Sequence, residues 1–85
     1  MNEFDKYVIK TALKALNAAG GAGLKKSKLM ELIDLANGDP LSNEQQESAF
    51  NMLQERGWMT WHMEPVFHDL RYTLTPRGLT ALEAM

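Results

Sequence analysis

The stretch RYTLTPRGLTALEAM (residues 71–85) indicates the fold class of this chain. Its first four residues alternate polar and apolar side chains, which is typical of a β-strand with one buried face. Thr75 and Pro76 then match the N-cap and the first position of a helix, because a threonine hydroxyl can accept from a free backbone N–H and proline leaves none unpaired. We therefore expect the last strand to run directly into a terminal helix.

A second strand is predicted just upstream. WMTWHM (58–63) and LRYTL (70–74) are both rich in aromatic and β-branched residues. EPVFHD (64–69) separates them, and Pro65 is unsuited to a central ladder because it has no N–H to donate. The two segments predict an antiparallel hairpin with residues 64–69 as its loop.

Three helices are predicted before the hairpin, because apolar residues recur there at spacings of three and four. GGAG (20–23) ends the first helix, and Ser42 with Gln45 forms a capping box at the start of the third. The chain forms one domain over residues 1–85, mainly α with a β-hairpin (α+β), in the order helix-helix-helix-strand-strand-helix. The predicted helices before the hairpin cover approximately residues 3–19, 24–37 and 43–56.

The composition is that of an ordinary globular domain. Hydrophobic residues make up 45% of the 85, which is enough for one small core. The chain has no cysteine, and this excludes a disulfide scaffold or a thiolate zinc site. Its start, MNEFDKYVIK, has no uninterrupted apolar stretch for a secretory signal, and no run reaches the roughly 18 apolar residues of a membrane span. These features predict a cytoplasmic location.

Charge is unevenly distributed along the chain. The net charge is −2, which argues against indiscriminate binding to nucleic acid. By segment, it is +2 over residues 1–38, −3 over residues 39–57 and −1 over residues 58–85. The predicted third helix is therefore the acidic part of the chain.

Two motifs resemble the winged helix-turn-helix family of DNA-binding domains. LQERGWM (53–59) is similar to the family's pattern at the end of the recognition helix, and YTLTPRGLTALE (72–83) to its pattern where the wing enters the terminal helix. The resemblance covers nearly all of the chain. It implies a short strand at Leu24 beside the wing, and double-stranded DNA as the partner of a small transcriptional regulator of the bacterial or phage type.

The resemblance also implies which residues would contact DNA. The third helix would enter the major groove, where asparagine and glutamine amides can pair with adenine. The expected base-reading residues are Asn43, Gln45, Gln46, Ser48 and Asn51. The expected phosphate contacts are Lys25, Lys26, Lys28 and Arg71.

A protein-protein interaction module without DNA binding is the alternative. Glu44 and Glu47 lie on the helix that would face the phosphates, and the arginine or lysine usual there is missing. A two-stranded hairpin over one helical layer cannot bury both faces, so part of its apolar surface is expected to be exposed. The expected partner-surface residues are Trp61, Met63, Val66 and Phe67. A homodimer through Phe4, Tyr7 and Leu82 is a further expectation.

The sequence gives no support for catalysis or for a cofactor. It has no Ser/His/Asp ordering, no glycine-rich phosphate loop after a strand and no metal-ligand array. His62 and His68 flank the hairpin loop beside Glu64 and Asp69, but no third ligand follows at a recognised spacing. We expect no enzyme activity, no metal and no small-molecule substrate.

Overall fold

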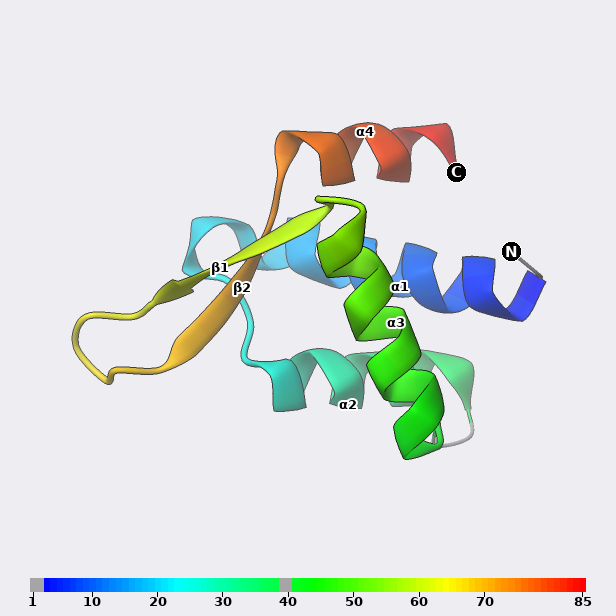
Figure 1. Cartoon of the computed structure of the whole chain (residues 1–85), viewed down its shortest axis with the longest axis horizontal. Coiled ribbons are helices and arrows are strands. Elements are labelled where there is room, and N and C mark those ends of the chain that lie inside the picture. The colour runs from blue at the N-terminus through cyan, green and yellow to red at the C-terminus, as the bar shows by residue number, and fades with distance from the viewer. Residues whose placement is uncertain (1–2, 39–40) are drawn as a thin grey trace.

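The computed structural model describes residues 3–38 and 41–85, with the backbone alone at residues 3–5 and 37. In these ranges the chain is mainly helical with a two-stranded antiparallel hairpin, and the predicted order of elements is confirmed (Figure 1). None of the described helices has the length and apolar character needed to cross a membrane. The elements are α1 (Glu3–Ala19), the 3-10 turn η1 (Gly20–Ala22), α2 (Lys26–Asn37), α3 (Asn43–Glu55), β1 (Met59–Met63), β2 (Leu70–Leu74) and α4 (Pro76–Ala84).

The core is built around α1. This helix lies between α2 and α4, and α3 crosses it at a steep angle (Figure 1). Each helix contributes an apolar stripe, because residues three and four apart share one face. The largest fully buried side chains are Ile9, Leu13, Leu16, Leu29, Ile33 and Leu53.

Local capping fixes where the helices begin. Ser42 and Gln45 form the predicted capping box at the start of α3. Thr75 is the N-cap of α4, and its Oγ1 accepts from Gly78 N at 3.0 Å. The same hydroxyl donates to Gly57 O at 2.6 Å, so one side chain joins the start of α4 to the turn that ends α3. That turn needs Gly57, whose φ is 70°.

Three predicted boundaries move by one or two residues, each for a backbone reason. α3 ends at Glu55 rather than Arg56, because Arg56 is its C-cap. β1 starts at Met59 rather than Trp58, because Trp58 N still donates to Leu53 O at the end of α3. α2 starts at Lys26 rather than Leu24, because Leu24 forms an isolated antiparallel bridge with Tyr72 of β2. The resemblance implied a short strand at Leu24, and the structure has an isolated bridge at this residue.

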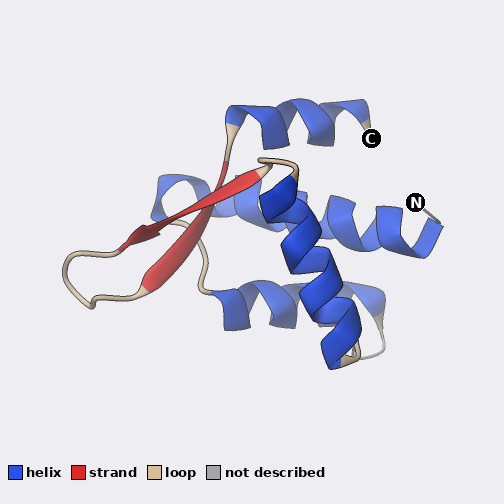
Figure 2. Ribbon diagram, viewed as in Figure 1, coloured by secondary structure: helices blue, strands red, loops and turns tan. Residues whose placement is uncertain are grey.

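The hairpin projects from the helical body, with its loop farthest from the helices (Figure 2). Its register pairs Met59 with Leu74, Trp61 with Tyr72 and Met63 with Leu70. Directly opposed residues lie on the same face of a hairpin, so these six side chains form one apolar face. The face is buried at its root, where Met59 is 4% exposed, and runs outward past the end of the core.

Candidate interaction surfaces

Lys26, a predicted phosphate contact, is held between α2 and α3. Its Nζ lies 2.7 Å from Glu47 Oε1 and 4.6 Å from the centroid of the Phe50 ring. Phe50 in turn packs edge to face on Tyr72, with ring centroids 4.8 Å apart. The ammonium group therefore compensates the charge of the glutamate that sequence reasoning had set against DNA binding.

The other three predicted phosphate contacts are also paired with carboxylates. Lys25 Nζ and Arg71 Nη2 lie 3.4 Å and 3.3 Å from the same oxygen, Asp69 Oδ2. Lys28 Nζ lies 3.9 Å from Glu31 Oε1 one turn along α2. The exposed Lys28–Glu31 pair contributes little to stability, about 0–1 kcal/mol, whereas the Arg71 and Asp69 side chains are each only 25% exposed. The consequence of these pairs is electrostatic, because the structure places a negative charge beside every cation assigned to phosphate.

The predicted base-reading residues differ in how available their side chains are. Asn43, Ser48 and Asn51 are exposed along α3. Gln45 Oε1 accepts from Ser42 N at 2.9 Å, so this amide is engaged in the capping box. Gln46 is half-buried and lines a pocket between α3 and α2. The structure therefore leaves three of the five both exposed and unengaged by other described residues.

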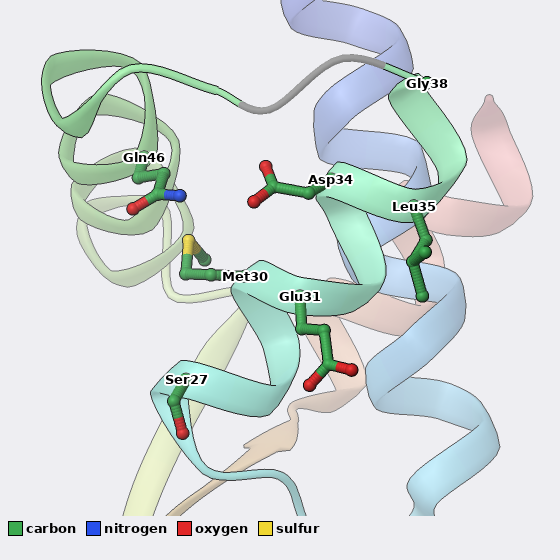
Figure 3. A pocket seen from close by; sticks show the side chains of 7 residues that line it. All are labelled: Ser27, Met30, Glu31, Asp34, Leu35, Gly38 and Gln46. Carbon is green, nitrogen blue, oxygen red and sulfur yellow. The ribbon is translucent and has the colours of Figure 1, made fainter.

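The pocket between α2 and α3 is open and lined by polar groups from both helices. In Figure 3, Asp34 of α2 and Gln46 of α3 point into the space between the helices, with Met30 at its floor. Asp34 Oδ1 is already used, because it accepts from Leu41 N at 3.0 Å. Among the described residues, no three His, Cys, Asp or Glu side chains lie together as metal ligands would. The lining residues are Ser27, Met30, Glu31, Asp34, Leu35, Gly38 and Gln46.

The outer part of the hairpin carries exposed apolar side chains, which we call the hairpin surface. Trp61 is 57% exposed and Phe67 is 73% exposed. Leu70 belongs to the same surface, although sequence reasoning missed it. Its pairing with the exposed Met63 could have identified it, because cross-strand partners share a face. The hairpin surface comprises Trp61, Met63, Val66, Phe67 and Leu70.

Hydrogen bonds within the loop fix the tip of the hairpin. The two carboxylate oxygens of Glu64 accept from Val66 N at 3.0 Å and Phe67 N at 2.5 Å. Glu64 N donates to Asp69 O, and His68 N donates back to Glu64 O. The backbone that presents Val66 and Phe67 is therefore ordered by its own residues, and both side chains remain exposed.

The residues predicted for a homodimer contact do not form one open patch in the described part of the chain. Tyr7 is half-exposed, but its hydroxyl donates to Ala36 O at the end of α2. Leu82 is half-buried against the core. The side chain of Phe4 lies outside the described residues. Tyr7 and Leu82 therefore do not form one exposed patch, and the homodimer through the two helices stays a prediction.

Comparison with known proteins adds no relative to this picture. A scan against protein-family models and searches of curated proteins and of solved structures found no match to the chain.

Proposed function

We propose that this chain is a winged-helix domain that acts as a protein-interaction module, with the hairpin surface as its contact. The element order and the bridge between Leu24 and Tyr72 support the winged-helix assignment. One observation carries the functional part: the hairpin surface projects from the body and leaves its large apolar side chains in water. We also propose a cytoplasmic location, because a cysteine-free composition fits a reducing compartment.

The hairpin surface has the properties of a binding site. Clustered exposed apolar side chains are uncommon on a protein without partners and mark interaction sites. Trp61 and Phe67 are of the type that dominates binding energy, with losses of about 2 kcal/mol or more on truncation at an interface centre. The Glu64 hydrogen bonds order the tip before binding, which lowers the entropic cost of association.

Electrostatics favour a protein partner over DNA. A domain that binds DNA gains most of its affinity by neutralising phosphates with lysine and arginine. Here Lys25 and Arg71 share Asp69, and Lys26 is paired with Glu47, so a phosphate would have to compete with a carboxylate that repels it at each of these cations. A protein surface imposes no such uniform negative charge.

A two-hybrid selection against genomic fragments from the source cell tests the proposal. Recovered partners should lose binding to the Trp61→Ser variant and keep it with Asn51→Ala, which alters an exposed residue of α3 instead. A selection that recovers no partner, or only partners indifferent to Trp61→Ser, would count against the proposal. Thermal unfolding of both variants checks that the folded state is retained.

DNA binding is the second candidate, favoured by the exposed Asn43, Ser48 and Asn51 on α3, the helix that Lys26 also contacts. On this alternative, Glu47→Gln should release Lys26 and remove a repelling charge. Affinity for a randomised duplex at low salt should then rise severalfold, and the salt dependence should steepen by about 0.9 in log-log slope.

Glu83→Gln on the exposed part of α4 is the matched control, since it changes the net charge equally. Fluorescence anisotropy of a labelled duplex measures both variants. Under the protein-interaction proposal, neither wild type nor Glu83→Gln binds the duplex, so the anisotropy stays at the value of the free duplex. If wild type binds the duplex and the Lys26→Gln substitution lowers its affinity, the result would favour DNA binding.

A further inference from the structure

The outer edge of β1 presents unpaired backbone groups. The ladder ends in bonds from Thr75 N to Trp58 O at 3.0 Å and from Glu64 N to Asp69 O at 2.7 Å. In an antiparallel pair the residues that bond to the partner strand alternate with residues that point away. The N–H and C=O groups of Met59, Trp61 and Met63 therefore point away from β2.

The opposite edge of the hairpin shows the same alternation, but there it is closed. Tyr72, the partner of Trp61, also directs its N–H and C=O away from the hairpin. Both are bonded to Leu24, at 2.8 Å and 2.9 Å. Within residues 3–38 and 41–85, no backbone group bonds Met59, Trp61 or Met63 in this way. The hairpin thus has one covered edge and one open edge.

The open edge lacks the usual protection against strand pairing. Edge strands in monomeric proteins commonly carry lysine, proline or a bulge that prevents a further strand from adding. β1, MTWHM, contains no Asp, Glu, Lys, Arg or proline, and its pairing with β2 runs without a bulge. Glu64 follows it, but both of its carboxylate oxygens are engaged in the loop.

We infer that a second copy of this chain pairs antiparallel with the open edge of β1, so that two hairpins form one four-stranded sheet. This inference rests on the proposed function and names the partner of the hairpin surface. The strand is symmetric about Trp61 in its apolar residues, because Met59 and Met63 lie two residues before and after it. In that register Trp61 opposes Trp61 of the second copy, and Met59 opposes its Met63. Every outward N–H and C=O of the strand then meets a partner.

Three features favour a second copy as the occupant. The one titratable side chain of β1, His62, opposes Thr60 of the second copy in this register, so no two like charges face each other directly. The hairpin projects from the helical body, with its loop away from the helices (Figure 1), and no described backbone group covers the outward N–H and C=O groups of β1. The pairing also brings Trp61 and Met63 of both copies onto one face, where an isolated two-stranded hairpin leaves them in water.

Sedimentation velocity over a wide concentration range tests the pairing with two substitutions at one position. Met63→Pro removes an outward N–H that the hairpin does not use, so the fold should survive. Met63→Thr also removes the side chain but keeps the N–H and suits a strand. We expect wild type to dimerise, Met63→Thr to dimerise more weakly because it loses the apolar side chain, and Met63→Pro to dissociate at least tenfold more readily than Met63→Thr. Backbone chemical shifts show whether each hairpin is intact.

Disulfide formation tests the register, because the chain has no native cysteine. The inferred register places Thr60 directly opposite His62 of the second copy, in a non-hydrogen-bonded pair with the closest Cβ atoms. A mixture of Thr60→Cys and His62→Cys should therefore oxidise to a covalent dimer faster than either variant alone. Equal rates in all three samples would overturn the register.

A wild type that stays monomeric at all concentrations would overturn the inference itself. If its two-hybrid partners still depended on Trp61, the interaction module would stand and only the identity of its partner would be wrong. A monomer that also recovered no partner would remove both.

Discussion

Replacing Gly78 by alanine is expected to lower the free energy of unfolding by about 3 kcal/mol or more, the upper range for overpacking a close contact. A Cβ at this position would lie 2.1 Å from Trp58 O and 2.6 Å from Leu74 Cδ1. Trp58 O cannot move away cheaply, because it accepts from Thr75 N at the junction of β2 and α4. The added methyl group should push α4 away from the base of the hairpin.

Gly21→Ala is the matched control for this substitution. No atom lies within 4 Å of the Cβ that it would add, and the backbone of Gly21 is not in the left-handed region. Alanine should therefore leave the free energy of unfolding unchanged, or raise it by up to about 1 kcal/mol by reducing the conformational entropy of the unfolded chain. Urea unfolding followed by circular dichroism compares the two. Equal midpoints for both variants would show that α4 does not pack as described.

Leu53→Ala should lower the free energy of unfolding by about 2–5 kcal/mol, as expected for a buried leucine that leaves a cavity. The side chain is 0% exposed, at the point where α3 reaches the hairpin. Its carbonyl accepts from Trp58 N, so loosening of Leu53 also affects the connection to β1.

Leu35→Ala deletes the same atoms from α2 where the side chain is 71% exposed, and should change stability by less than about 0.5 kcal/mol. Thermal and urea unfolding measure both variants. A loss at Leu35 as large as that at Leu53 would contradict the burial pattern that defines the core.

Local signals in the sequence predicted the elements because each has a local physical cause. The capping box of Ser42 and Gln45 and the N-cap at Thr75 involve residues three apart, so the sequence alone displays them. The change of hydrophobic period after Gly57 likewise marked the hairpin. The boundary at Leu24 shifted because its long-range pairing with Tyr72 overrides local preference. The boundary at Trp58 shifted because its N–H closes the last turn of α3 on Leu53 O, a local bond that the alternating pattern does not display.

The balance of charge at the candidate site depends on tertiary structure, so the sequence could not predict it. Lys26 meets Glu47, and Lys25 meets Asp69, only because α2 packs beside α3 and beside the hairpin. The sequence alone did not show that carboxylates lie beside Lys25, Lys26 and Arg71, so it predicted all three as available to bind phosphate. The sequence did predict the exposed Trp61, Met63, Val66 and Phe67, since two strands cannot cover both of their faces.

Photo-crosslinking in the cell shows directly whether the hairpin tip contacts a protein. A photo-crosslinking phenylalanine analogue is placed at Phe67 of the hairpin surface and, in a separate variant, at Asn51 of α3, both exposed positions. After irradiation, the adducts are separated by their sensitivity to protease or nuclease. We predict protein adducts from Phe67, including those to a second copy of this chain, and no nucleic-acid adduct from Asn51. Nucleic-acid adducts from Asn51 with none to protein from Phe67 would contradict the account.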